Sequence, residues 1–219
     1  MTYSDVMRVP RTFGFLDLSG FTNYTAAYGD DAAGRILGTF RTLVRQVASE
    51  RGVRIAKWLG DGCMIVAVDQ LNALAFITDL EQRARNVCAP LTLRAGIATG
   101  HALLFDGDDY IGSAVNMASR LCDHAQNFDV LMPTMQLERL PEGVVAEPFG
   151  EVELRGFPGT IEIVRLTGTP PPPNTGHVDA YGVGADLVGG DRVGADTAEA
   201  DRSSPIRDTH PGRTDPGWR

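Results

Sequence analysis

Two aspartates each stand beside a short apolar run, Asp17 in TFGFLDL (12–18) and Asp61 in GDG, just before CMIVAV. Each has an ordinary structural explanation, because Asp17 can end a strand and Asp-Gly is a common hairpin signal. Together they indicate more. At the ends of adjacent strands the two carboxylates would meet at one edge of a sheet, where unpaired like charges repel. The pair predicts a divalent cation, since Mg²⁺ takes one or two carboxylates and leaves its other positions to water and phosphates.

The segment SGFT (19–22) follows directly. A glycine followed by free backbone N–H groups at a helix N-terminus suits a polyphosphate, so Phe21 and Thr22 are candidate substrate contacts. A phosphatase with an aspartyl nucleophile would need a second aspartate two residues after Asp17, and Ser19 stands there. The segment therefore favours phosphate binding over an aspartyl-phosphate mechanism.

Lys57 is the only lysine among 20 basic residues and lies within the apolar run VRIAKWL. It could be a surface lysine that extends into solvent. Its compact ammonium with three donors also has a chemical use, because a lysine can donate to a purine ring nitrogen while a carboxylate accepts from an exocyclic amine. Adenine needs that pair of partners, and guanine, with a carbonyl at position 6, does not.

The segment DGDDYIGSAVNMASRL (106–121) holds three further candidates. Asn116 and Arg120 are four residues apart and share one face of the expected helix, away from its apolar side. Such a pair is usually a solvated face, and Asp109 alone would be a turn residue.

The elements that must position these residues form an irregular series. We expect strands at 12–18, 53–59, 63–68, 91–100, 144–154 and 160–166, and helices from about 22, over 31–51, over 71–87 and over 113–126. Gly60-Asp61-Gly62 should join two strands in a hairpin. This order predicts an α+β fold with a mixed or antiparallel sheet and helices packed on one side.

Composition limits the organisation and partners of the 219-residue chain. One domain is expected over 11–167, after an N-terminal extension (1–10) and before a disordered tail rich in Pro, Gly and Asp (168–219). The net charge of −8 argues against a nucleic-acid partner. No apolar run approaches the ~20 residues that span a membrane, the N-terminus has no export-like apolar region, and three isolated cysteines fit reduced thiols. We expect a cytoplasmic protein without a membrane partner.

Four motifs, FGFLDLSGFT, KWLGDGCMIVA, LRAGIATG and DDYIGSAVNMASRL, occur in an order and spacing that resemble the catalytic domain of the class III nucleotidyl cyclases. The resemblance covers about residues 11–166 and is to the short bacterial type without membrane or sensor domains. It implies a ferredoxin-like or palm-like cyclase fold and conversion of ATP to 3′,5′-cyclic AMP and pyrophosphate. It also implies two divalent cations, Mg²⁺ or Mn²⁺, and a homodimer whose sites are shared between subunits.

The resemblance implies roles for the metal and base residues. Asp17 and Asp61 match the two metal-binding aspartates, and the backbone of Leu18 is implied as a further metal ligand. Lys57 matches the adenine-binding lysine, and Asp109 matches its acidic partner for the amino group.

It also implies roles for the residues at ribose and phosphate. Asn116 matches the residue that orients the ribose, and Arg120 matches the one that stabilises the transition state. Arg94 stands where the family can place a phosphate-contacting arginine. Arg155 stands where the family usually has a triphosphate-binding lysine, a mild departure because arginine also binds phosphate.

Two other functions stay open. A guanylyl cyclase is disfavoured because Lys57 and Asp109 both suit adenine. A catalytically silent cyclase-like domain, serving nucleotide binding or dimerisation, would be expected to lack a metal aspartate or Arg120, and this chain has all of them.

Overall fold

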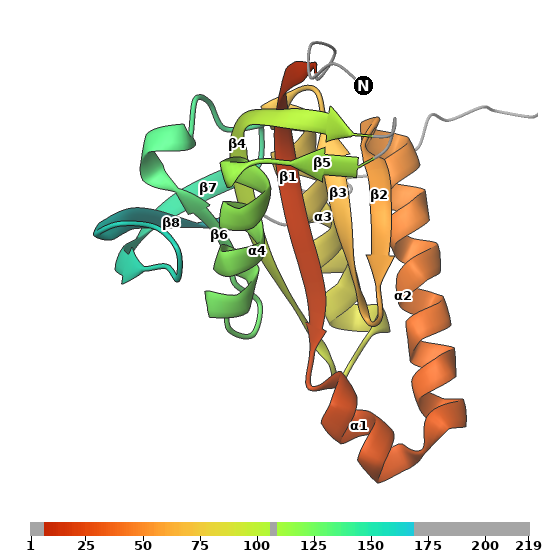
Figure 1. Cartoon of the computed structure of the whole chain (residues 1–219). Coiled ribbons are helices and arrows are strands. Elements are labelled where there is room, and N and C mark those ends of the chain that lie inside the picture. The colour runs from red at the N-terminus through yellow and green to blue at the C-terminus, as the bar shows by residue number, and fades with distance from the viewer. Residues whose placement is uncertain (1–6, 106–108, 169–219) are drawn as a thin grey trace, which may run out of the picture. The chain divides into compact units, whose positions relative to one another are not determined.

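The computed structural model describes residues 7–105 and 109–168. Its elements in chain order are β1 (Arg8–Ser19), α1 (Phe21–Tyr28), α2 (Asp30–Arg51), β2 (Arg54–Leu59), β3 (Gly62–Ala67), α3 (Gln70–Val87), β4 (Thr92–Phe105), β5 (Asp109–Ile111), α4 (Ser113–His124), β6 (Val130–Pro133), the 3-10 helix η2 (Thr134–Gln136), β7 (Val144–Glu153) and β8 (Thr160–Gly168). The strands form one sheet in the order β2-β3-β1-β4-β6-β8-β7, with β5 paired to β4 (Figure 1). Only the β4–β6 pair is parallel among the described strands.

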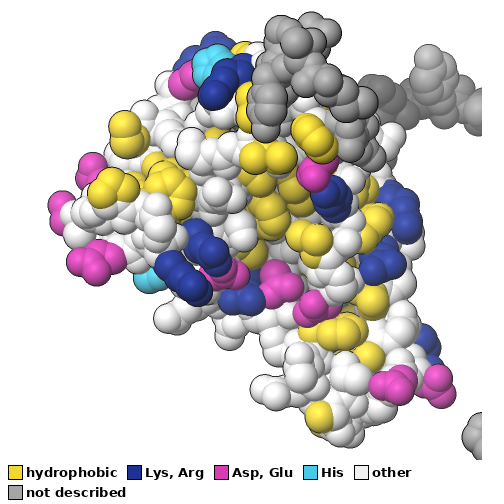
Figure 2. Space-filling model, viewed as in Figure 1, with side chains coloured by type: hydrophobic (Ala, Val, Ile, Leu, Met, Phe, Trp, Pro, Cys, Tyr) yellow, Lys and Arg dark blue, Asp and Glu magenta, His cyan; other side chains and the backbone are white. Residues whose placement is uncertain are grey.

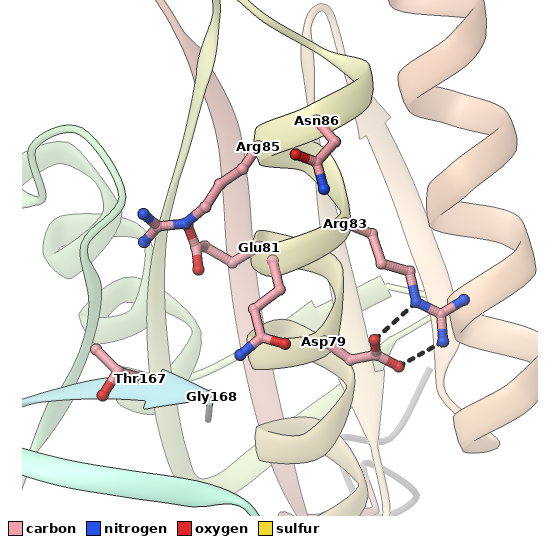
Figure 3. Close-up of a pocket in the computed structure, with 8 residues that line it drawn as sticks. Asp79, Glu81, Arg83, Arg85, Asn86, Thr167 and Gly168 are labelled. Carbon is pink, nitrogen blue, oxygen red and sulfur yellow. Dashed lines mark hydrogen bonds and ion pairs between the residues drawn. The ribbon is translucent and has the colours of Figure 1, made fainter. Parts of the chain in front are cut away.

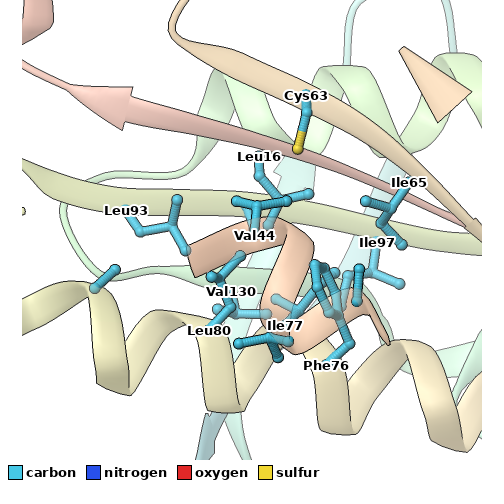
Figure 4. Packing of buried hydrophobic residues seen from close by; sticks show 14 of the residues in the cluster. Leu16, Val44, Cys63, Ile65, Phe76, Ile77, Leu80, Leu93, Ile97 and Val130 are labelled. Carbon is cyan, nitrogen blue, oxygen red and sulfur yellow. The ribbon is translucent and has the colours of Figure 1, made fainter. Parts of the chain in front are cut away.

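Helices α2 and α3 cover one face of the sheet and form the main core with it. Successive side chains of a strand alternate between faces, so Leu16 and Leu18 of β1 point to these helices. Figure 4 shows the packed apolar side chains of this core, among them Leu16, Val44, Cys63, Ile65, Phe76, Ile77, Leu80, Leu93, Ile97 and Val130. Burying one such side chain stabilises the fold by roughly 1.5–3 kcal/mol. The predicted α+β sheet with helices packed on one side is confirmed in α2 and α3.

Helix α4 lies on the opposite face, over β4 and β1 (Figure 1). Its Ala114 and Ala118 pack against Phe13 and neighbouring strand residues. The helix can approach this closely because residue 96 of β4 is a glycine. A Cβ there would lie 2.3 Å from the carbonyl oxygen of Ala118. Helix α4 is therefore held in a fixed position, and its outward face presents Asn116.

The strand bounds differ from the predicted ones mainly in β1, β4 and β5. β1 begins at Arg8 and β4 continues to Phe105, while β5 falls on DYI, which resembles a turn in sequence. β8 ends at Gly168, and the rest of the predicted tail lies outside the described residues. No helix in the described ranges is long and apolar enough to cross a membrane.

Candidate nucleotide and metal site

Gly62 brings the Asp61 turn against Asp17. Leu59 pairs with Gly62, so Gly60 and Asp61 form a two-residue hairpin turn. A Cβ on residue 62 would lie 2.3 Å from the Leu16 carbonyl oxygen and 3.2 Å from a carboxylate oxygen of Asp17. The hairpin predicted at Gly60-Asp61-Gly62 is confirmed, and its turn consists of Gly60 and Asp61, while Gly62 is the first residue of β3. The left-handed φ of 65° falls on Gly60, as in a type II′ turn, and Gly62 serves close packing instead.

The two carboxylates share one counterion. Arg94 of β4 is the cross-strand partner of Asp17 and donates two hydrogen bonds, of 2.6 and 3.0 Å, to one of its carboxylate oxygens. Burial raises the pKa of Asp61, and the charge of Asp17 raises it further, while the backbone N–H of Asp61 and the charge of Arg94 act in the opposite direction. One positive charge therefore faces two negative ones, which is the imbalance that a cation would offset.

A cavity of about 340 Å³ opens at these carboxylates, lined by Asp17, Leu18, Ser19, Gly20, Phe21, Thr22, Asn23, Asp61 and Arg94. It gathers the predicted metal residues with the predicted phosphate contacts of α1. Helix α1 starts after Gly20, whose φ is 87°, and the N–H groups of its first turn have no acceptor within the helix. The cavity therefore combines anionic and N–H-donating walls, as a metal–phosphate ligand requires.

The donor set fits a divalent cation only in part. The described residues contain no group of three or more His, Cys, Asp or Glu side chains that could hold a metal ion. Two carboxylates and a backbone carbonyl still suit Mg²⁺, which usually keeps several waters and completes its shell with substrate phosphates. Such a site would bind its metal together with the nucleotide.

Lys57 and Asp109 meet although 52 residues separate them. The Lys57 Nζ lies 2.7 Å from Asp109 Oδ1, and the backbone N–H of Tyr110 donates to the same oxygen over 2.9 Å. Figure 1 shows β5 lying in front of β1, and the Tyr110 ring packs on the Phe13 ring at 5.4 Å, edge to face. The hydrogen bond from Lys57 lowers the pKa of Asp109. The two side chains are 45% and 43% exposed, so a ligand can reach the pair.

The remaining predicted residues do not line the carboxylate cavity. Asn116 is exposed on α4, and Arg120 makes an ion pair of 3.1 Å with Asp123, three residues further along the helix. Arg155 is exposed in the turn between β7 and β8. A second cavity of about 260 Å³ shares Asp17 and Arg94 with the first and extends to Asp123 of α4. Sequence reasoning missed Asp123, although its spacing from Arg120 was visible.

The face that carries these residues is apolar at its centre. Figure 2 shows hydrophobic side chains gathered between α4 and β2, bordered by acidic and basic side chains. Exposed large apolar residues of β2, β4 and β5 are Leu59, Phe105 and Ile111. An exposed apolar surface with a polar border is typical of a protein–protein contact.

A larger cavity of about 640 Å³ lies between α3 and the end of β8 (Figure 3). Its charged side chains already pair with one another or with α2, Arg83 with Asp79 and Glu50, and Arg85 with Glu81. Its charges are therefore balanced, and it is a weaker candidate for an anionic nucleotide or a cation.

Comparison with known proteins decides the fold family. The chain is 36% identical over 128 residues to an adenylate cyclase of Streptomyces coelicolor, which covers 58% of the chain and 33% of that protein. It is 31% identical over 160 residues to a pH-sensitive adenylate cyclase of Mycobacterium tuberculosis, covering 71% of the chain and 40% of that protein. The adenylyl cyclase CyaB of P. aeruginosa superposes with a TM-score of 0.64 at 23% identity, over 76% of this chain and 97% of that one. The chain has the class III nucleotidyl cyclase fold.

The predicted resemblance to this family is thereby confirmed. The cyclase fold alone does not decide the base, because the guanylyl cyclase Cya2 superposes with a TM-score of 0.66 at 20% identity, over 77% of this chain and 97% of that one. No protein-family model matches the chain. The chain spans 30–41% of the length of the curated relatives it matches.

Proposed function

We propose that this cyclase-fold domain is an adenylyl cyclase, converting ATP to 3′,5′-cyclic AMP and pyrophosphate at sites shared by two copies of the chain. The observation that carries the choice of ATP is the Lys57–Asp109 ion pair. A ligand that inserts between the two must accept a hydrogen bond from the ammonium and donate one to the carboxylate. In adenine the N1 atom accepts and the 6-amino group donates. Guanine exchanges these two positions, with a donor at N1–H and an acceptor at O6, so a base held in the same orientation fits the pair only if it is adenine.

The carboxylate cavity supports the triphosphate end of the proposal. Asp17, Asp61 and the Leu18 carbonyl would hold the divalent cations, and the N–H groups of Phe21 and Thr22 would donate to phosphate oxygens. When bound, the cations would acidify the ribose 3′-hydroxyl and neutralise phosphate charge.

The reaction forms a bond from the ribose O3′ to the α-phosphorus and breaks the bond from that phosphorus to the β-phosphate oxygen. Pyrophosphate leaves, and the 3′-hydroxyl proton goes to solvent. Asn116 would align the ribose for this in-line attack. Holding the ribose in place lowers the entropic cost of reaching the transition state. Arg120 would stabilise the charge that develops on the α-phosphate, and Arg94 and Arg155 would contact the other phosphates.

The placement of Arg120 supports a shared site. It does not line the cavity of Asp17 and Asp61, yet the second cavity joins Asp17 to Ser119 and Asp123 of the same helix α4. Two copies packed about a two-fold axis by the face that is apolar at its centre would bring the carboxylates of one to the Arg120 of the other, twice. A homodimer with two equivalent sites follows.

Mixing two inactive variants tests the proposal. Asp17→Ala and Arg120→Ala each spoil both sites of a homodimer, because every site needs one residue from each subunit. After subunit exchange, one site of each heterodimer carries both lesions, and the other carries neither. Half the dimers are then heterodimers with one good site of two, so about a quarter of wild-type cyclic AMP formation is expected. A mixture that stays inactive, although heterodimers are shown to form, refutes the shared site.

A further inference from the structure

The turn that carries Asp61 is tied to α2 by a hydrogen bond. Nη2 of Arg41 donates a hydrogen bond of 2.9 Å to the carbonyl oxygen of Gly60. That carbonyl and the N–H of Asp61 belong to one peptide unit, which is planar, so fixing one end fixes the other. The same N–H lowers the pKa of the Asp61 carboxyl group, because it stabilises the carboxylate. Arg41 therefore restrains the peptide that supports a predicted metal ligand.

The structure leaves open space around Gly60 within this turn. Gly60 has a φ of 65°, and a Cβ built on it would meet nothing within 4 Å. Glycine can rotate over a wide range of backbone angles, so a free Gly60 would let the Gly60–Asp61 peptide reorient. A hydrogen bond from a charged donor contributes enough to select one orientation.

The chain offers a matched control in Arg45, one helical turn further along α2. The guanidinium carbons of Arg41 and Arg45 lie 5.0 and 5.1 Å from the centre of the Trp58 ring. Both arginines therefore make the same kind of cation–π contact with β2. In the described residues the contact to Gly60 comes from Arg41.

We propose that Arg41 is a positioning residue of the metal site, which orients Asp61 through the Gly60 carbonyl. The inference rests on the proposed function, because it requires Asp61 to bind metal. Groups that orient metal ligands from behind typically change metal affinity by 10–100-fold when they are removed. The hydrogen bond from Arg41 is single and exposed to solvent, so we expect the loss of metal affinity to lie at the lower end of that range.

Metal affinity in the full chain tests the proposal. Mn²⁺ binding is measured by electron paramagnetic resonance with a non-cyclisable ATP analogue present, in wild type, Arg41→Met and Arg45→Met. Methionine keeps an apolar stem against Trp58 and removes the donor. Arg41→Met should weaken Mn²⁺ binding about tenfold, whereas Arg45→Met should leave it within about twofold of wild type. In an Asp61→Asn background, Arg41→Met should cause no further loss. Arg41→Leu, which also removes the donor and keeps an apolar side chain, replaces Arg41→Met if that variant does not fold.

Equal losses in the two methionine variants would show that Arg41 acts only by packing on Trp58 and would overturn the inference. A tenfold loss that persists in the Asp61→Asn background would also overturn it, since the effect would not pass through Asp61. Failure of the proposed function looks different. In that case Asp61→Asn alone would bind Mn²⁺ as tightly as wild type.

Discussion

Two glycines of one hairpin should respond differently to the same substitution, because the structure requires each for a different reason. Gly62 has no room for a side chain, since a Cβ there would lie 2.3 Å from the Leu16 carbonyl oxygen, and real contacts of this kind stay above 3.0 Å. Gly60 has free space around its Cβ position but a φ of 65°. Gly60→Ala therefore costs only the left-handed backbone penalty of about 1 kcal/mol.

Gly62→Ala must move β3 away from β1, which breaks packing and ladder hydrogen bonds and costs about 3 kcal/mol. For a domain of this size, each kcal/mol lowers Tm by about 2–4 °C, so losses of about 3 °C for Gly60→Ala and 9 °C for Gly62→Ala are expected. Thermal unfolding followed by circular dichroism measures both. A Gly62→Ala protein at least as stable as Gly60→Ala would refute the close approach of the turn to Asp17.

Two further predictions concern charge. The raised pKa of Asp61 means that its ionisation costs stability as the pH rises above the ordinary pKa of an aspartate, so metal-free Asp61→Asn should be more stable than wild type at pH 7. The difference should shrink as the pH falls below the raised pKa and vanish below the ordinary pKa that the carboxyl has in the unfolded chain, and a less stable Asp61→Asn at pH 7 in urea titrations would contradict it. Lys57→Glu combined with Asp109→Ser should lower the ratio of cyclic AMP to cyclic GMP product about tenfold, because the site then leaves adenine's groups unpaired. An unchanged product ratio at equal ATP and GTP would show that the pair does not select the base.

Local patterns predicted the fold well. The helical spacing of Ile36, Phe40, Val44 and Val47 predicted α2, and all four are buried in the structure. The two apolar runs around Asp61 predicted β2 and β3. Such elements follow from neighbours in sequence, and their apolar periodicity is strong.

The contacts that hold the site residues in place could not be predicted from local patterns. Strand β5 pairs with β4, and Tyr110 also packs on Phe13 while Asp109 reaches Lys57, contacts that span many residues of chain. The close approach at Gly62 depends on β1 lying beside β3, and Arg41 reaches Gly60 only after α2 has packed on the sheet. No local sequence pattern distinguishes a glycine that is needed for close packing from a glycine that is needed for a turn.

Charge balance, more than cavity size, separates the two candidate pockets. In the 640 Å³ cavity, Arg83 and Arg85 are matched by Asp79, Glu50 and Glu81, so a charged ligand would have to break existing pairs before it gained its own. In the 340 Å³ cavity, Asp17 and Asp61 face one guanidinium, and burial followed by the charge of Asp17 raises the pKa of Asp61. A divalent cation relieves that repulsion and adds positive charge for an incoming phosphate. The smaller cavity therefore gains from binding a metal and an anion together, and the larger one does not.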